Sequence, residues 1–294
     1  MSVSTPTTLL DLPAPFRGHF IPVTTSTMDE SKNHSGHGYA VMAGLQTQGR
    51  GTNTRAWSSI EGNLLVTFAM HPDKLGLEGL AHWRPLELLC GYVLSQVATQ
   101  ELSCLPNPPL LEFRPRNDLF VINPALDDND SKKARKLAGV LVEPLQSDWR
   151  QGVAVGMGLN ITSCPDDASM MEQVTYKKGY FATSLTAQGV VTDPELGDRF
   201  RLLREFCELF PIELAAMQVG GVAAIWQKMG LMDDAGNTVF APRSGQADPI
   251  AGRFTGYDGD GDFRLSGHAA SLRTADWRPV ALRYWESLGF SILR

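Results

Sequence analysis

Two apolar runs lie near the middle of the chain: Lys136-Leu137-Ala138-Gly139-Val140-Leu141-Val142-Glu143 and Gly152-Val153-Ala154-Val155-Gly156-Met157-Gly158-Leu159. Both are short and rich in valine, leucine and glycine, and a polar segment separates them. Near-continuous apolar runs of this length are typical of strands that are buried on both faces of a sheet. We therefore expect residues 137–143 and 152–159 to form two neighbouring strands of a sheet.

The residues on either side of these runs predict a mixture of strands and helices. Runs at 39–45, 63–70 and 119–122 have the composition of strands. The capping-box spacing from Thr27 to Glu30 predicts a short helix. Pro85 and the helical spacing of the apolar residues after it predict a second helix, and helical spacing returns over residues 195–229.

Two polar segments interrupt this pattern. Residues 46–59 have no regular hydrophobic period, which indicates a loop, and residues 123–135 have the composition of an insertion. Neither segment has enough apolar residues to anchor it. We expect both to be mobile without ligand, and we expect a ligand to order only the first.

The residue pattern changes near residue 233, from helical spacing to short segments between turns. Asp233-Asp234-Ala235-Gly236-Asn237 predicts a turn, and short strand-like pieces follow between closely spaced glycines. Several short strands with turn signals between them suggest a small β-barrel. We therefore expect two domains, at residues 1–232 and 233–294. Asp258-Gly259-Asp260-Gly261-Asp262 lacks the glycine and glutamate positions of a calcium-binding EF-hand loop, so a β-turn is expected.

Composition limits the function classes. Lysine and arginine total 26 and aspartate and glutamate 32 among 294 residues, so the net charge is −6 and no broad basic field favours nucleic-acid binding. The four cysteines are far apart, which predicts reduced and mostly buried thiols and no structural metal site. Residues 1–15 do not resemble a secretory signal, and no run reaches 18 apolar residues. A soluble, cytoplasmic protein with no membrane partner is expected.

Three segments could carry chemistry. Gln48-Gly49-Arg50-Gly51-Thr52-Asn53-Thr54-Arg55-Ala56-Trp57 combines flexible glycines with two arginines suited to phosphate or carboxylate, but a solvated turn with a packed tryptophan is the alternative. Asn117-Asp118 before a strand could orient a reacting group or simply form a turn. Lys136 could project at a buried anion or lie solvated at a strand end.

The order of these segments resembles the successive blocks of the biotin protein ligase (holocarboxylase synthetase) family, within the biotin/lipoate ligase superfamily. The resemblance covers most of residues 20–190 and includes Gly156-Met157-Gly158-Leu159-Asn160 and Ala182-Thr183-Ser184-Leu185. It implies an α/β (α+β) catalytic domain, with a mixed sheet flanked by helices, and a small C-terminal SH3-like β-barrel.

The resemblance also implies an ATP-dependent biotin–protein ligase. Such an enzyme forms biotinyl-5′-adenylate from biotin and ATP with Mg²⁺, then transfers biotin to a lysine of a carboxylase carrier domain. The residues implied as catalytic are Lys136, Asp118 and Arg50. Those implied to bind biotin are Ser26, Thr27, Gln48, Gly49, Arg50 and Gly139, and those implied to bind the adenylate are Arg55, Trp57, Asn117, Lys136 and Asn160.

The sequence departs from the family pattern at several positions. Thr52 replaces a basic loop residue, Thr54 replaces a glycine, Ile60 replaces a proline, and Arg116 stands two residues before Asp118 in a block that usually contains tryptophan. Loss of the loop cation should weaken the hold on the adenylate. A lipoate or octanoate ligase, or a non-catalytic binding paralogue, are the alternatives. With about 20 residues before Ile21, no N-terminal helix-turn-helix domain and no DNA binding are expected.

Overall fold

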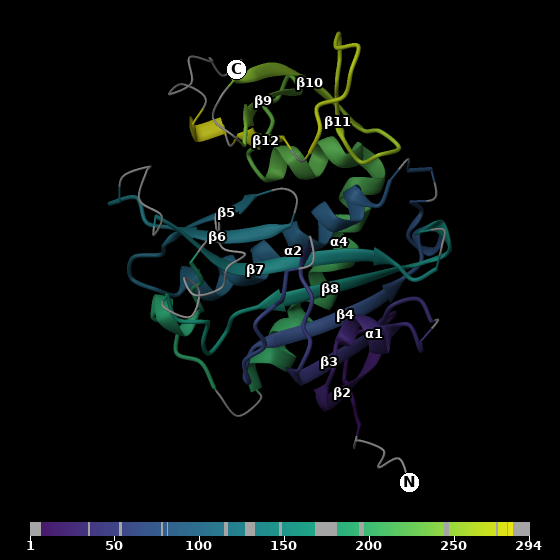
Figure 1. Cartoon of the computed structure of the whole chain (residues 1–294), viewed down its shortest axis with the longest axis vertical. Helices are drawn as coiled ribbons and strands as arrows, with labels where there is room; N and C mark the ends of the chain where they lie inside the picture. Colours follow the sequence, from purple (N-terminus) through teal and green to yellow (C-terminus); the bar gives the residue numbers. More distant parts are fainter. Residues whose placement is uncertain are drawn as a thin grey trace.

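The computed structural model describes residues 7–34, 36–52, 55–77, 79–80, 82–114, 117–126, 133–146, 149–167, 181–193, 197–243, 247–274, 276–280 and 282–284. Their central feature is a twisted sheet with the strand order β1-β2-β3-β4-β8-β7-β6-β5 (Figure 1). The strands are β1 (Thr8–Leu9), β2 (Arg17–Thr24), β3 (Tyr39–Gln46), β4 (Leu64–Met70), β5 (Leu110–Arg114), β6 (Asp118–Ile122), β7 (Ala134–Pro144) and β8 (Val153–Leu159). β2 and β3 are parallel and the other neighbours antiparallel, which makes the sheet mixed.

The two apolar runs at 137–143 and 152–159, which are expected to be neighbouring strands, do lie side by side in the sheet. β7 and β8 pair antiparallel at its centre, with Gly139 opposite Gly158. The predicted strands at 39–45, 63–70 and 119–122 correspond to β3, β4 and β6.

Two details of the strand prediction are corrected by the structure. No strand is expected from the sequence before Thr27, yet β2 lies there and pairs with β3. The expected insertion at 123–135 is too long, because β7 already begins at Ala134 and Arg135 pairs with Val121. Residues 127–132 of that segment lie outside the described residues.

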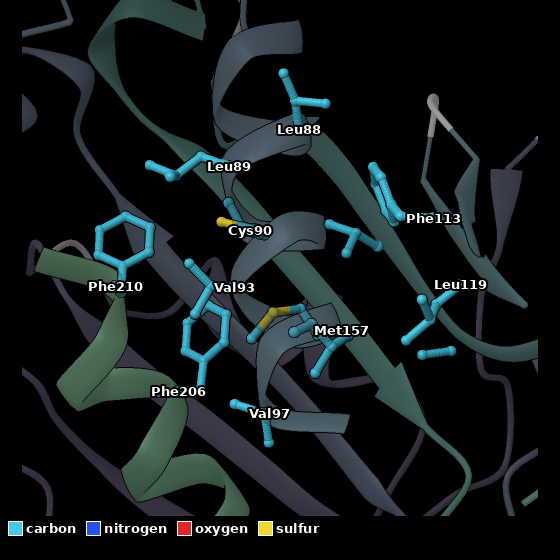
Figure 2. Close-up of a cluster of buried hydrophobic side chains, with 14 of the residues drawn as sticks. Leu88, Leu89, Cys90, Val93, Val97, Phe113, Leu119, Met157, Phe206 and Phe210 are labelled. Carbon is cyan, nitrogen blue, oxygen red and sulfur yellow. The ribbon is translucent and has the colours of Figure 1, made fainter. Parts of the chain in front are cut away.

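Two long helices cover one face of the sheet. They are α2 (Arg84–Ser103) and α4 (Gly197–Lys228), and Figure 2 shows the buried side chains between them and the strands. Phe68 of β4 stacks on Phe206 of α4 with 5.7 Å between ring centroids. Gly91 lets α2 approach β5 closely, since a Cβ there would lie 2.2 Å from Cζ of Phe113.

The helix α4 is long and apolar enough to cross a membrane by length and composition alone, a test that core helices of soluble proteins also pass. In this protein its first half is part of the core, with Leu203, Phe206 and Phe210 fully buried. Further along, Gly221 has φ 66°, which kinks the helix.

The short helix α1 (Thr27–Ser31) lies on the opposite face of the sheet, as its contact with Thr67 shows. Thr67 and Phe68 are consecutive in β4, so their side chains point to opposite faces. Single-turn 3₁₀ helices occur at η2 (Pro72–Leu75), η3 (Trp149–Gln151), η4 (Thr186–Gln188) and η5 (Leu282–Tyr284).

A second sheet follows α4, with strands β9 (Asn237–Pro242), β10 (Ile250–Tyr257), β11 (Phe263–Leu265) and β12 (Trp277–Val280) in the order β11-β10-β9-β12. Trp226 of α4 stacks on Phe254 of β10, 3.9 Å between centroids, and joins this sheet to the core. The predicted strands after residue 233 are therefore confirmed. Closure into a barrel and the boundary at 232/233 stay predictions.

The five residues from Asp258 to Asp262 form the tight turn between β10 and β11, as expected. Oδ1 of Asp258 accepts hydrogen bonds from the backbone N–H groups of Asp260 and Asp262. All four cysteines are free. The expectation that they are mostly buried holds for Cys90 and Cys207 and is wrong for Cys104, which is exposed.

Candidate functional site

A cavity opens on the face of the sheet that carries α1. The cavity, counted together with the open solvent at its mouth, contains about 450 Å³ that no atom occupies. It is lined by residues of α1, the end of β3 and the loop after it, strands β4, β7 and β8, and the residue before β6: Thr27, Met28, Gln46, Arg50, Gly51, Thr52, Trp57, Leu65, Val66, Thr67, Asn117, Lys136, Gly139, Val140, Leu141, Gly156, Met157 and Gly158.

The floor of the cavity is made of glycines because of the alternation in β8. Val153, Val155, Met157 and Leu159 enter the helix-covered core, so Gly156 and Gly158 face the cavity. Gly139 lies opposite Gly158 on β7. Three adjacent positions without side chains let a flat or extended group lie directly on the backbone.

Uncharged polar groups gather at one end of this floor. Thr67 pairs with Gly156 across β4 and β8, and its hydroxyl lies 2.7 Å from the hydroxyl of Thr27. Oε1 of Gln46 accepts hydrogen bonds from the N–H (2.8 Å) and the hydroxyl (3.1 Å) of Thr27. This corner offers hydroxyl and amide groups but no formal charge.

A cation lies at the other end. Nζ of Lys136 is 2.6 Å from Oδ1 of Asp118, and both side chains are about one-quarter exposed. The backbone of Lys136 is fixed to the segment after residue 180, since its N–H donates to Phe181 O and its C=O accepts from Thr183 N. Lys136 also lies 5.3 Å from the ring of Trp57, close enough for a cation–π contact.

The loop after β3 folds over the cavity as a narrow hairpin. Arg50 bridges to Ala56, Gly51 N–H donates to Arg55 O, and Trp57 N–H donates to Gly49 O. The indole of Trp57 lies on the glycine floor: a Cβ on Gly158 would be 2.5 Å from its Cε2. Nε1 of this indole is buried and has no hydrogen-bond partner among the described residues.

Arg50 lines the cavity but does not approach Lys136. Its NH2 is 3.0 Å from Oδ1 of Asp29 in α1 and 3.3 Å from Oε2 of Glu143 in β7. Glu143 is four residues further along β7 than Gly139, or about 13 Å at the usual rise of a strand. Arg50 and Lys136, which the resemblance implies are both catalytic, are therefore held apart.

Most of the residues predicted from the sequence surround this cavity. Thr27, Arg50, Trp57, Asn117, Lys136 and Gly139 line it. Asp118 does not line the cavity itself but pairs with Lys136, which does. Gly49 is buried near the start of the loop after β3. Asn117 also fixes the strand register, since its Nδ2 donates to Val140 O at 2.6 Å.

Four predicted site residues have other surroundings. Ser26 is buried as the N-cap of α1, Gln48 and Arg55 are exposed outside the lining, and Asn160 is buried after β8. Nδ2 of Asn160 donates to Thr183 O, 2.9 Å away, which ties two loops together. The ligand contacts assigned to these four residues stay predictions. Thr54 and Arg116 lie outside the described residues.

The cavity lining includes Gln46, Thr67, Gly156 and Gly158, which are not among the site residues expected from the sequence. Gln46 is the last residue of β3, and its side chain contacts Thr27 of α1. In the sequence, its place directly after the predicted strand at 39–45 favours Gln46 over Gln48 as the residue that faces the cavity. The described residues contain no group of three or more His, Cys, Asp or Glu side chains that could hold a metal ion.

Comparisons with known proteins agree with this architecture. Residues 18–160 match the model of the biotin/lipoate A/B protein ligase family. The chain is similar to the solved biotin protein ligase from Aquifex aeolicus in complex with biotin and ATP, at 18% identity and a TM-score of 0.57 over 90% of this chain and 98% of that one.

A second similar structure is the biotin protein ligase from Leishmania major in complex with biotin, at 21% identity and a TM-score of 0.54 over 92% of this chain and 99% of that one. No curated protein sequence matches the chain significantly. At these identities the solved structures show a shared fold, which includes the mixed sheet and the C-terminal β region.

Proposed function

Since the chain belongs to the biotin/lipoate A/B protein ligase family, we propose that it is an ATP-dependent biotin–protein ligase. Its substrates are biotin, MgATP and a carboxylase carrier domain with an acceptor lysine. The similar structures from A. aeolicus and L. major, which hold biotin with ATP and biotin respectively, support this choice of ligand.

One observation carries the proposal: the cavity has a corner of hydroxyl and amide groups, then a glycine floor, and then the cation Lys136 at the far end of that floor. Biotin has an uncharged ureido head, an apolar chain and a terminal carboxylate in the same order. The head would bind Thr27, Gln46 and Thr67, whose hydroxyl and amide groups both donate and accept hydrogen bonds. The chain would cross Gly158 and Gly139, and the carboxylate would reach Lys136.

In the first step a carboxylate oxygen of biotin attacks the α-phosphorus of ATP. The new bond is O–P, and the bond to pyrophosphate breaks and carries its electron pair away. Lys136 would bridge the carboxylate and the α-phosphate, where negative charge accumulates in the transition state. To do so its ammonium must leave Asp118, to which it is now paired at 2.6 Å.

In the second step the acceptor amine attacks the carbonyl carbon of biotinyl-adenylate, and AMP leaves with the electron pair of the C–O bond. A lysine amine with a pKa near 10.4 is mostly protonated at neutral pH and must lose a proton. Asp118, once separated from Lys136, is the carboxylate in position to orient the amine and accept a hydrogen bond from it.

A lipoate or octanoate ligase is the second candidate. The heads of those ligands are a dithiolane ring and a plain alkyl end, neither of which hydrogen-bonds well. Thr27, Gln46 and Thr67 already hydrogen-bond to one another, but such a head would offer no partner to their remaining donors and acceptors, a loss of roughly 1–3 kcal/mol for each one that it buries. The polar corner therefore favours biotin.

The proposal is tested by incubating the protein with a biotin carrier domain, MgATP and either biotin, lipoate or octanoate. A biotinyl mass increase on the carrier supports it. Modification with lipoate or octanoate alone would assign the other branch of the superfamily. Binding of biotin without any transfer would favour a non-catalytic paralogue.

A further inference from the structure

Both cations that line the cavity are neutralised by carboxylates. Lys136 is paired with one, Asp118. Arg50 is paired with two, Asp29 and Glu143, which come from α1 and β7 on either side of the loop. Among the ion pairs of the described residues, Arg50 therefore faces two carboxylates, one of which, Asp29, is also 3.1 Å from Lys32.

The contacts of Arg50 are close but poorly aligned. Its Nε and NH2 atoms are buried, and neither makes a hydrogen bond of good geometry to any described residue, although NH2 lies within 3.3 Å of both carboxylates. A phosphate could offer the guanidinium two parallel oxygens, which is its preferred arrangement. The carboxylates therefore compete with an anionic ligand but do not satisfy Arg50 fully.

Arg50 is also linked to Trp57 through the backbone of the hairpin. The two residues are joined through the backbone bridge between Arg50 and Ala56, next to Trp57 in sequence. While Arg50 remains at Asp29 and Glu143, the indole of Trp57 covers Gly158 and Gly139, the floor on which a ligand would lie. Release of Arg50 toward Lys136 would allow the hairpin and its indole to move together.

We propose that Asp29 and Glu143 are positioning residues that hold Arg50 away from the nucleotide phosphates and thereby lower the affinity of the protein for ATP. This inference rests on the proposed function, because it takes the anion that competes for Arg50 to be the triphosphate of ATP. The two carboxylates act only through Arg50.

The test is calorimetric titration with MgATP and, separately, with inorganic triphosphate. Partly exposed ion pairs contribute roughly 0.2–1 kcal/mol, so Glu143→Gln and Asp29→Asn should each tighten binding by about 1.5- to 5-fold. In an Arg50→Gln background the same substitutions should have no effect, as a double-mutant cycle requires. Glu112→Gln is the matched control, because Glu112 pairs with Arg114 at 2.8 Å on β5 and does not line the cavity.

Unchanged or weaker triphosphate binding in both Glu143→Gln and Asp29→Asn would overturn the proposal. So would a gain that persists in the Arg50→Gln background, or an equal gain in Glu112→Gln, since both would indicate a general effect of net charge. Asp29 is about half exposed, so its variant keeps the test available if Glu143→Gln fails to fold. Triphosphate binding with the expected cycle but no biotinyl transfer would contradict the proposed function and leave this inference standing.

Discussion

Lys136 and Gly139 lie on the same face of β7 although they are an odd number of residues apart, with Nζ of Lys136 3.2 Å from the position of a Cβ on Gly139. Regular alternation would place them on opposite faces. The pairing with β6 explains the exception: Leu119 is opposite Ala138 but Phe120 is opposite Lys136, so Leu137 is an extra, bulged residue. The bulge brings Lys136, Gly139 and Asp118 to one end of the cavity floor.

Lys136→Ala tests the charge at this end of the floor. If the ammonium stabilises the carboxylate and the α-phosphate, its loss removes a charged hydrogen bond of about 1.5–3 kcal/mol and slows adenylate formation at least about tenfold. The free energy of unfolding should fall by less than about 1 kcal/mol, because the ion pair with Asp118 is partly exposed. Pyrophosphate exchange and urea unfolding measure the two effects. Adenylate formation at the parental rate would show that Lys136 has another role.

Gly158→Ala tests the glycine floor. The added Cβ would lie 2.5 Å from Cε2 of Trp57 and would project into the space proposed for the biotin chain. Overpacking of about 1–3 kcal/mol corresponds to a loss of biotin affinity of at least about fivefold. Gly259→Ala is the control, since nothing lies within 4 Å of a Cβ at that position. Equal biotin affinities in the two variants, measured by calorimetry, would place the ligand elsewhere.

Thr52→Arg tests the departure from the family loop. Thr52 lines the cavity but offers only a neutral hydroxyl, and neutral hydrogen bonds are roughly half as strong as charge-assisted ones. The arginine variant should therefore release preformed biotinyl-adenylate more slowly while the acceptor step is unchanged. A chase of labelled adenylate with excess unlabelled ligand gives the escape rates. If they are identical, repeating the chase in an Arg116→Ala background shows whether Arg116 already supplies the charge.

His82 predicts a pH dependence of stability at the junction of α2 and the second sheet. Burial first, and Arg84 second, lower the pKa of His82 from 6.5 to about 4. The unfolded chain therefore binds more protons than the folded one between these two values, and stability falls as the pH drops from 6.5 to 4. The loss attributable to His82 is up to about 3 kcal/mol.

His82→Gln should reduce this loss, measured as the free energy of unfolding in urea at several pH values. It should not abolish the loss, because burial also lowers the pKa of His19 and of His37. The exposed His268 provides the matched control, His268→Gln. A pH dependence that is the same in His82→Gln and in the unaltered protein would contradict the assignment.

The sequence predicted the elements whose pattern is local. The apolar runs of β7 and β8, the capping-box spacing at α1 and Pro85 at the start of α2 each carry their signal within a few residues, although the N-cap of α1 is Ser26 and not Thr27, where that spacing begins. β2 was missed because Pro22 lies inside it, and proline usually argues against a central strand. The proline is tolerated here because β1, the strand on the other side of β2 from β3, pairs with His19 and Phe20 and does not extend to Pro22.

The site was predictable only in part, for the same reason. Lys136, Gly139 and Asn117 lie next to strands whose positions the pattern fixes. Which glutamine faces the cavity depends on where β3 ends and how it pairs with β2, and the bulge at Leu137 arises from pairing between strands. The contacts of Arg50 join residues from three distant segments, and no local pattern indicates them.

The most direct test of the account is the mass of a biotin carrier domain after incubation with this protein, biotin and MgATP. We expect one biotinyl group to be added to the carrier, with no addition when biotin or ATP is omitted and much slower addition by Lys136→Ala. An unmodified carrier, or a carrier modified only when lipoate or octanoate replaces biotin, would contradict the assignment of this cavity to biotin.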